Sequence, residues 1–208
     1  MDEQINGDAL NLRAQNEEVT QPVLTTTPPK KKSSLIELLK FAFIAAVIVI
    51  PVRMFIAQPF VVSGSSMVPT FHDADYLIVD ELSYHLRDPQ RGEVIVFRYP
   101  NDPTKFFIKR VIGLPGETIK IKGSEVTILN KENPDGFIMN EPYVQNKSSD
   151  VLQTTLGETQ YFAMGDNRIA SSDSRSWGNL DRKYMVGRAL LRIVPFKDAG
   201  TLPGYYQQ

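Results

Sequence analysis

Hydrophobic and polar positions divide the chain into three stretches. Residues 1–34 are mostly polar and show no sustained hydrophobic period, which predicts a disordered tail. From residue 35 to residue 62 the chain is predominantly apolar, and Phe41 to Val52 carry no charge. Beyond Val62, short runs of β-branched and aromatic residues alternate with turn residues, and this pattern is typical of an antiparallel β domain.

Seven runs in the third stretch are predicted to be strands. They are Tyr76–Val79, Glu93–Phe97, Phe106–Lys109, Thr118–Lys122, Glu125–Leu129, Gln160–Ala163 and Val186–Val194. Turn signals such as Asp88-Pro89 and Pro115-Gly116 separate them. The expected β domain spans residues 61–208, within the usual size range of a domain. Its more polar part, at about residues 123–158, is predicted to leave the core as a hairpin.

The apolar stretch predicts a single transmembrane helix over residues 35–60. A span needs about 20 predominantly apolar residues. The charge-free centre is shorter than that, so charged residues near its ends would have to snorkel to the interface. The preceding cluster Lys30-Lys31-Lys32 predicts a cytoplasmic N-terminus and an extracytoplasmic β domain at the cell membrane. Pro51 is expected to kink the helix or to end it.

Three other interpretations of the apolar stretch are considered. A cleaved signal peptide is disfavoured because the lysine cluster follows a long polar tail, and because Phe55-Ile56-Ala57 lacks the small residues of an A-x-A cleavage site. An interfacial helix is disfavoured because the centre is apolar on all sides. A buried helix of a soluble domain stays open as the simpler alternative.

Composition narrows the chemistry without defining it. The 208 residues carry 23 Lys and Arg against 24 Asp and Glu, so no overall field favours nucleic acid as a partner. There is no cysteine, which excludes disulfides, thiol catalysis and cysteine-ligated metal. The two histidines, His72 and His85, show no HExxH spacing, so neither a metal nor a cofactor is expected.

Ser66 is the candidate nucleophile, because it lies in a turn-rich run, Ser63 to Thr70, directly after the apolar stretch. A serine hydroxyl needs a positioned base and an oxyanion site. His72 follows six residues later, but catalytic partners are recognised by geometry and are rarely neighbours in sequence. A surface histidine is therefore the better interpretation of His72.

Lys109 is the second candidate base. It ends the apolar run Phe106-Phe107-Ile108, where burial would disfavour its ammonium form. Lowering its pKa from about 10.4 toward 8 requires about 3 kcal/mol, and a neutral lysine could accept the serine proton. A solvated lysine at the edge of a sheet is the alternative, and the residues alone favour it.

Four blocks of sequence, in this order, resemble the type I signal peptidases, the membrane-anchored Ser/Lys endopeptidases that remove signal peptides from exported proteins. The blocks are Ser66–Thr70, Arg91–Phe97, Lys109–Glu117, and Gly165–Arg168 with Ser171, Asp173–Arg175 and Trp177-Gly178. The resemblance covers roughly residues 35–197. It implies a signal-peptidase-type antiparallel β catalytic domain after a single membrane helix, with no metal or cofactor.

The resemblance also implies residue roles. Ser66 matches the nucleophile and Lys109 the general base. The supporting positions match as follows: Ser171 orients the lysine, Asp173 and Arg175 form a charge pair beside the site, and Asp166 pairs with Arg110.

One position departs from part of the family. Some members have a serine two residues before the nucleophile, whose hydroxyl helps to hold the oxyanion, and here that position is Gly64. The backbone N–H of Ser66 is still expected to donate. The second donor is left open between a backbone amide near Gly64 and a neighbouring hydroxyl.

The substrate implied by the resemblance is an extended signal peptide with small residues at positions −1 and −3 from the cleavage site, added as a strand beside the segment before the nucleophile. The groove is expected to be lined by Phe60, Val61, Val62, Met67, Phe107 and Ile108. The other implied partner is the lipid bilayer, and a monomer is expected. A membrane-tethered β domain that binds peptides without cutting them is the alternative. A self-cleaving repressor with Ser/Lys chemistry is disfavoured because no DNA-binding helical domain is evident.

Overall fold

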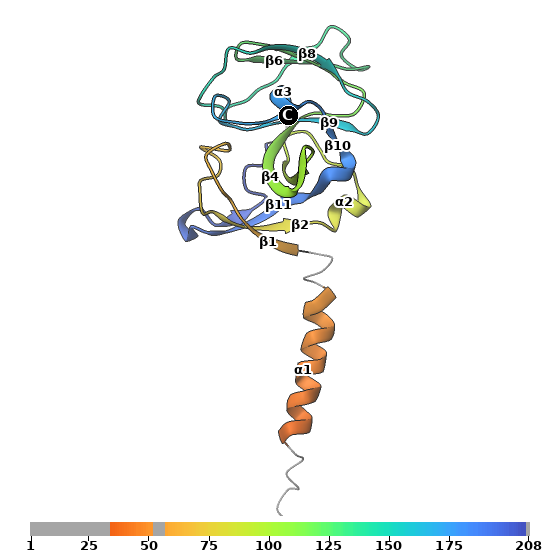
Figure 1. Cartoon of the computed structure of the whole chain (residues 1–208), viewed down its shortest axis with the longest axis vertical. Coiled ribbons are helices and arrows are strands. Elements are labelled where there is room, and N and C mark those ends of the chain that lie inside the picture. Colours follow the sequence, from red (N-terminus) through yellow and green to blue (C-terminus); the bar gives the residue numbers. More distant parts are fainter. Residues whose placement is uncertain (1–33, 52–56, 207–208) are drawn as a thin grey trace, which may run out of the picture. The chain divides into compact units, whose positions relative to one another are not determined.

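The computed structural model describes residues 34–51 and 57–206 of the chain (Figure 1). The predicted tail over residues 1–34 lies outside the described residues, apart from Ser34. The described part holds one long helix, two antiparallel sheets and several short helical turns. The expectation of a mainly antiparallel β fold is confirmed.

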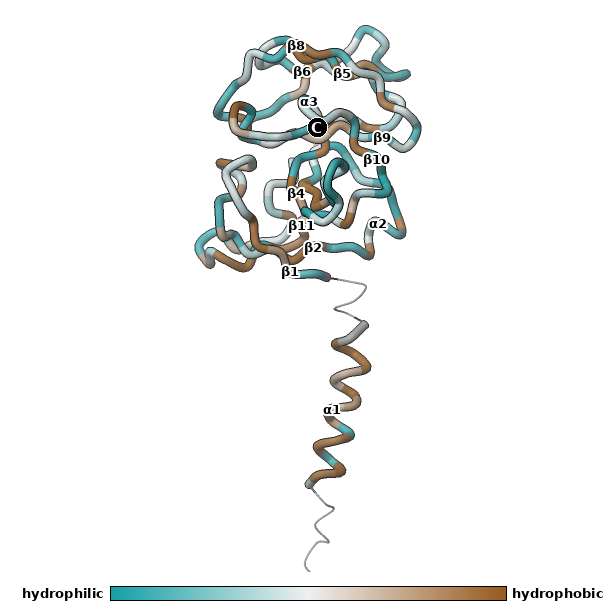
Figure 2. The backbone as a smooth tube through the Cα atoms, viewed as in Figure 1, coloured by the Kyte–Doolittle hydropathy of each residue, from teal (hydrophilic) through white to brown (hydrophobic). Residues whose placement is uncertain are grey.

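Helix α1 spans Ser34–Pro51, and most of its described apolar side chains are exposed. Figure 2 shows it as mostly hydrophobic along its length. Leu35 and Phe41, for example, are 64% and 71% exposed. Within residues 34–51 and 57–206, no helix is long and apolar enough to cross a membrane.

The predicted C-terminal end of the helix, at residue 60, is wrong, because Ala57–Val61 forms strand β1. Pro59 explains the difference. A proline inside a helix loses one backbone hydrogen bond and clashes with the preceding turn, and it disfavours helical geometry at the residue before it. Among the residues that the structure describes, strand β1 pairs with β2 (Tyr76–Asp80) alone and forms the edge of its sheet, where proline is tolerated.

The larger sheet has the strand order β1-β2-β11-β3-β4-β9-β10, with β12 paired to β11. Its further strands are β3 (Val94–Tyr99), β4 (Asp102–Gly113), β9 (Gln160–Met164), β10 (Leu180–Asp181), β11 (Met185–Val194) and β12 (Gly200–Thr201). Short helices α2 (Ser83–Leu86) and α3 (Ser174–Trp177) and 3₁₀ turns at Arg182–Tyr184 and Phe196–Asp198 complete the connections.

The smaller sheet has the order β7-β6-β5-β8. Its strands are β5 (Thr118–Lys122), β6 (Glu125–Leu129), β7 (Phe137–Ile138) and β8 (Val151–Thr155). Residues 123–158 are therefore not the single hairpin expected, since they supply three strands of a second sheet. All seven predicted strands are present. Strand β8 and the short strands β7, β10 and β12 were not predicted, and β1 was predicted as the end of the helix.

One apolar cluster joins the two sheets. Ile119 and Ile121 of β5 and Val126 and Ile128 of β6 alternate with exposed or half-buried residues, and their side chains pack with Ile112, Phe162 and Met164 of β4 and β9. Figure 1 shows β6 and β8 at one end of the β domain, β1 and β2 at the other, and β4 and β9 between them. Strand β4 thus runs through the middle of the domain, and its position determines where Lys109 lies.

Candidate active site

The loop that carries Ser66 is fixed at several points. Before it, Val62 donates its backbone N–H to Asp75 O (2.9 Å) and accepts from Ala74 N (2.9 Å). Asn167 holds the loop itself, because its backbone N–H donates to Ser66 O and its side-chain amide donates to Ser65 O, both at 3.1 Å. Asn167 is therefore a site residue with no predicted role, although it lies inside the fourth block of the resemblance.

Lys109 lies beside Ser66 although 43 positions separate them in sequence. Its Nζ donates to Ser66 Oγ at 2.7 Å and to the carbonyl oxygen of Ile108 at 2.8 Å. The residue is 4% exposed, and Ile95 of β3 pairs with it across the sheet. The structure thus resolves the choice between a solvated edge lysine and a buried one in favour of the buried lysine.

Burial lowers the pKa of Lys109 to about 8, although the nearby carboxylates of Asp173 and Asp166 act in the opposite direction. The low-dielectric surroundings disfavour the ammonium form, and the two anions favour it. With that pKa, roughly a tenth of the side chains are neutral at pH 7. The same Nζ–Oγ contact serves both protonation states. The ammonium donates to Ser66 Oγ, and the neutral amine can accept the Ser66 proton.

His72, the other candidate base, is exposed on the loop after Ser66. Its backbone N–H donates to Asp75 Oδ2 at 3.1 Å. The basic group hydrogen-bonded to Ser66 Oγ is Lys109. Among the described residues, no group of three or more histidine, aspartate and glutamate side chains is placed to hold a metal ion.

Arg110 and Asp166 form a two-pronged ion pair with no solvent exposure. Arg110 Nε donates to Asp166 Oδ1 at 2.8 Å, and its Nη2 donates to Oδ2 at 2.5 Å. Arg110 Nη1 donates to Gly92 O at 2.9 Å and also to Gly204 O, and the guanidinium stacks 3.8 Å from the ring centroid of Tyr143. Every side of the guanidinium is thus contacted, as a buried charge requires.

The same ion pair connects the base strand to the nucleophile loop. Thr70 Oγ1 donates to Asp166 Oδ2, so Asp166 is bonded both to β4 and to the loop that holds Ser66. Thr70 lies inside the first block of the resemblance but had no predicted role, and the residues around Gly204 were not predicted to belong to the site. Nothing in the local pattern of either segment indicated contact with Arg110, because their separations in sequence are 40 and 94 residues.

Asp173 is a buried acceptor that shapes the loop before α3. It accepts the backbone N–H of Gly165 (3.0 Å) and of Arg175 (3.2 Å), the latter as the N-cap of α3. Arg175 also donates to it through Nε (2.8 Å) and Nη2 (2.7 Å), and reaches Asp150 at 2.6 Å. Each of the two buried aspartates therefore has its own arginine, which is the arrangement of structural ion pairs.

Ser171 lies near Ser66 without a hydrogen bond to Lys109. Its hydroxyl is buried and has no hydrogen-bond partner within the described part of the chain. A Cβ at Gly165 would overlap both Ser171 Oγ and the carbonyl oxygen of Ser66, so the three groups are in close contact. The structure places Ser171 next to the site but does not contain the expected contact with the lysine.

Gly64 has a backbone conformation that explains the missing serine. Its φ is +88°, in the region where side chains are strained, and no atom lies within 4 Å of the position a Cβ would take. Its N–H donates to Asp73 Oδ1 at 2.8 Å. The Gly64 amide is thus already engaged, and Asp73 is a further residue that the sequence gave no reason to select.

A cavity of about 440 Å³ opens beside Ser66 and Lys109. Five of the six predicted groove residues line it: Phe60, Val61, Val62, Phe107 and Ile108. The prediction for Met67 is wrong, because Met67 is 1% exposed and packs in the core with Phe71 and Leu77 instead. The lining residues that sequence analysis missed are Ser63, Leu77, Val96, Lys105, Phe106 and Ser172.

In the described part of the chain, two strands with unpaired edges flank this cavity. Strand β1 is at the end of its sheet. In β4, Phe106 to Lys109 pair with β3 on one side, whereas pairing with β9 on the other side begins only at Arg110. Phe60 of β1 and Phe106 of β4 meet with ring centroids 5.2 Å apart. An extended peptide between these edges would find free backbone groups along an apolar cavity that ends at Ser66.

Comparison with known proteins agrees with this geometry. A family model described as "Signal peptidase, peptidase S26" matches residues 35–194. A probable signal peptidase I-2 of Synechocystis sp. is 35% identical over 194 residues, which is 88% of this chain and 86% of the relative. The signal peptidase I of Leptolyngbya laminosa is 36% identical over 182 residues, covering 84% and 87% of the two chains.

A solved structure of a signal peptidase I from Enterococcus faecalis V583 is 28% identical, covers 49% of this chain and 97% of its own, and has a TM-score of 0.42. The family match covers most of the chain, and so do both relatives. The residues matched by the family model include Ser66, Lys109 and the run from Gly165 to Arg175. On these matches, the chain belongs to the signal peptidase family, peptidase S26.

Proposed function

We propose that Ser66 and Lys109 are the nucleophile and the general base with which this endopeptidase cleaves signal peptides from exported preproteins. The observation that carries the proposal is the 2.7 Å contact between Ser66 Oγ and the buried Nζ of Lys109. A nucleophile within hydrogen-bond reach of a base with a lowered pKa is the arrangement that covalent catalysis requires.

The reaction proceeds through an acyl-enzyme. Neutral Lys109 accepts the hydroxyl proton as Ser66 Oγ bonds to the scissile carbonyl carbon, and a tetrahedral oxyanion forms. The lysine ammonium then gives that proton to the leaving nitrogen as the C–N bond breaks. A water molecule, deprotonated by the same lysine, attacks the ester, releases the signal peptide and restores Ser66.

The oxyanion is held by the backbone N–H of Ser66 and by a hydroxyl near it in this proposal. The engagement of Gly64 N–H by Asp73 argues against a donor at Gly64. The Ser63 side chain lines the cavity together with Ser66, and it is the neighbouring hydroxyl that we assign as the second donor.

The surrounding charges hold the two reacting groups in register. Asp166 and Arg110 tie the Ser66 loop to the strand of Lys109 through Thr70, and Asp173 with Arg175 fixes the loop that contains Gly165. Ser171 is assigned as a positioning residue because its buried hydroxyl lies beside the Ser66 carbonyl. A hydrogen bond from Ser171 to Lys109 would have to form when the site closes on substrate.

The substrate lies as an extended strand between β1 and β4. The side chains at positions −1 and −3 face the cavity, where Val62 and Ile108 with the aromatic rings of Phe60 and Phe107 leave room for small residues. Backbone hydrogen bonds to the free edges give affinity that does not depend on sequence, and the cavity selects size.

Residues 35–56, which precede strand β1, are proposed to anchor the enzyme in the cell membrane, with the tail in the cytoplasm and the β domain outside. The exposed apolar side chains of α1 support this proposal, because such a surface is unfavourable in water. The 18 described residues of α1 measure about 27 Å at 1.5 Å per residue, short of a hydrocarbon core of about 30 Å. The anchor therefore needs residues 52–56, which lie outside the described residues.

The proposed function is tested with the full chain in liposomes and a preprotein that carries an A-x-A site. Ser66→Ala is expected to process none of it and Lys109→Met to process it about 10³-fold more slowly. Ser65→Ala, at the exposed neighbouring serine, is expected to process it like the parent protein. A serine-directed penem probe is expected to label the parent protein and Ser65→Ala, but not Ser66→Ala. Processing by Ser66→Ala would refute the dyad, and peptide binding without labelling or cleavage would favour the non-catalytic β domain.

A further inference from the structure

Among the described residues that line the cavity, two are charged: Lys109 and Lys105. Lys109 is buried and contacts Ser66. Lys105 lies four residues earlier on the same strand, and its side chain is 67% exposed. The proposed reaction uses Lys109 and leaves Lys105 without a role.

The strand fixes how the two lysines are related. Residues 106–110 pair with β3 in regular register, and the register shifts between Asp102 and Phe106. Lys105 lies in this irregular part of β4 and lines the same cavity as Lys109. With a rise of about 3.3 Å per residue, Lys105 lies about 13 Å along the strand from Lys109. A charge at that distance is too far from Ser66 Oγ to take part in proton transfer.

An extended substrate has the same repeat. If its scissile carbonyl lies at Ser66, the side chains at −1, −3 and −5 point to one face, and −5 is about 13 Å from −1. Phe60 and Phe106 both line the cavity and contact each other, and Phe106 is next to Lys105 in sequence. In the proposed binding mode, the residues before the cleavage site run along β4 from Lys109 toward Lys105. The −5 side chain therefore comes to lie at Lys105.

Asp102 does not cancel this charge for a bound peptide. Asp102 Oδ2 pairs with Lys105 Nζ at 3.0 Å, but Asp102 does not line the cavity. A peptide in the cavity therefore meets the ammonium before the carboxylate. A second cation, Arg98, lies nearby with its guanidinium 4.7 Å from the ring centroid of Phe106.

We propose that Lys105 determines specificity by reading the charge of the substrate residue at −5, favouring an acidic side chain there and disfavouring a basic one. The inference rests on the proposed cleavage at Ser66 and adds a position to its substrate. Because both partners are solvent-exposed, the interaction is of the weak class, and it is screened by salt.

The test uses the full chain in phosphatidylcholine liposomes, which carry no net charge, and three preproteins identical except for Glu, Gln or Lys at −5. The parent protein is expected to cleave them in the order Glu, Gln, Lys. The Glu and Lys substrates are expected to differ about threefold in kcat/KM at low salt, and the difference is expected to shrink at about 0.5 M salt. Lys105→Gln is expected to treat the three substrates alike, and Lys105→Glu to reverse the order.

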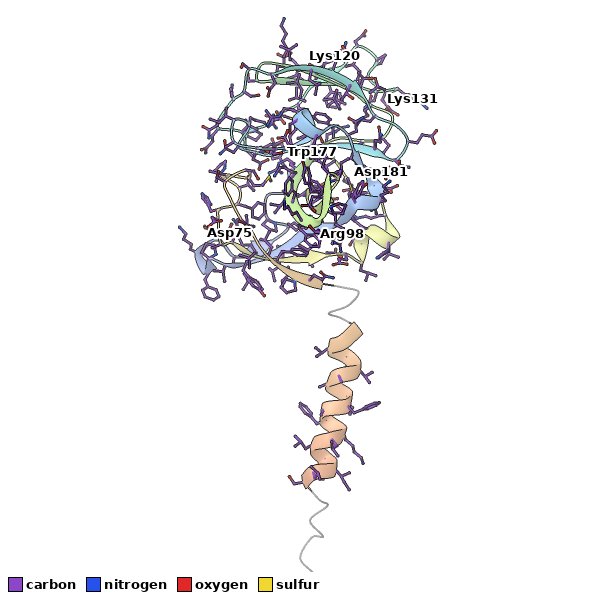
Figure 3. The ribbon with its side chains drawn as sticks, in the orientation of Figure 1. Asp75, Arg98, Lys120, Lys131, Trp177 and Asp181 are labelled. Carbon is purple, nitrogen blue, oxygen red and sulfur yellow. The ribbon has the colours of Figure 1, made fainter. Side chains whose placement is uncertain are left out.

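Lys120→Glu is the matched control, since Lys120 is an exposed lysine of β5 on the smaller sheet. Figure 3 shows it well apart from Arg98, the cation next to Phe106. This variant is expected to keep the parent order. An unchanged order in Lys105→Glu, or reversal by Lys120→Glu as well, would overturn the inference. Failure of the underlying reaction would give a different result, namely cleavage that persists in Ser66→Ala.

Discussion

The four-stranded sheet and the eight-stranded sheet fill their interiors with different side chains. The smaller sheet contributes aliphatic residues such as Ile119, Ile121 and Ile128 to the core, and none of the buried charged residues in the described part of the chain lies on its strands. The larger sheet buries apolar clusters too, but next to them it buries Lys109 and Arg110 on β4, and the Asp166 and Asp173 that follow β9. Among the described strands, those with buried charged side chains thus belong to the larger sheet, which also carries Lys109 beside Ser66.

This difference indicates that the side chains that stabilise the fold are not the ones that hold the reacting groups in place. Burial of aliphatic side chains stabilises the fold at about 25 cal/mol per Å² of apolar surface. A buried ion pair gives little net stability, because removing two charges from water offsets their attraction. The aliphatic core therefore explains why the domain folds, and the Arg110–Asp166 and Arg175–Asp173 pairs explain how the Ser66 and Gly165 loops are held against β4. Four predictions test that separation.

The largest expected effect is on activity alone. Lys109→Met removes the base and keeps a side chain of similar length, so kcat is expected to fall by about 10³-fold, within the range for general-base catalysis. Stability to urea at neutral pH is expected to be equal or higher, because a buried ammonium no longer has to be desolvated. Single-turnover processing and urea unfolding measure the two quantities.

Lys120→Met, on the smaller sheet, serves as the control and is expected to change neither kcat nor the stability to urea. A Lys109→Met protein that loses stability as well as activity would contradict the separation, because Lys109 would then be part of the structural core.

The second prediction concerns the buried ion pair. Arg110→Met leaves the Asp166 carboxylate buried without its partner, and removal of one member of such a pair costs about 3–5 kcal/mol of unfolding free energy. The double variant Arg110→Met with Asp166→Leu is expected to regain most of that loss, because no charge is then stranded. Urea unfolding of both variants measures the difference. A double variant as unstable as the single one would mean that the pair itself stabilises the fold.

The third prediction concerns the aliphatic core. Ile128→Ala deletes a fully buried side chain and is expected to cost about 3 kcal/mol of unfolding free energy, as large-to-small core substitutions do. The fraction that remains folded is expected to cleave with the parent kcat, because Ile128 belongs to the cluster between the sheets and the cavity is lined by other residues. A changed kcat per folded molecule would show that the smaller sheet is coupled to the site.

The two kinds of core were also predictable from sequence to different degrees. The alternating pattern of Thr118–Lys122 and Glu125–Leu129 indicates, within each segment, which face of the strand is buried. Both strands were predicted with the bounds that the structure has. That they belong to a second sheet was not evident, because β7 has two residues and β8 pairs with β5 across a gap of about thirty positions. Strand propensity is local information, whereas sheet membership is decided by packing.

In the active site, residue types in four blocks indicated the pair Ser66 and Lys109, but not the contacts that hold it. Asn167, Thr70 and Gly204 make hydrogen bonds to segments more than 90 residues away in sequence. Asp73 accepts the N–H of Gly64 through its carboxylate. No periodicity or motif marks such contacts. Met67 was misplaced for a related reason, since the turn after Ser66 directs it into the core instead of the cavity.

The smallest expected effect is a displacement of the pH profile. The neutral amine of Lys109 is the reactive form, so kcat/KM is expected to be low where the ammonium predominates and to rise with pH through the lysine pKa of about 8. A profile governed by a group near pH 6.5 would instead indicate a histidine base. The profile of the parent protein therefore tests the assignment of the base before any variant is made.

Asp166→Asn sharpens the same measurement. The Asp166 carboxylate raises the pKa of Lys109, and asparagine keeps an acceptor for Thr70 and Arg110 without the negative charge. Removing the anion disfavours the ammonium, and the unbalanced charge of Arg110 acts in the same direction, so the midpoint is expected to move to lower pH. Ile128→Ala is expected to leave the midpoint unchanged. A midpoint that moves in Ile128→Ala, or stays fixed in Asp166→Asn, would show that the buried charges of the larger sheet do not tune the base.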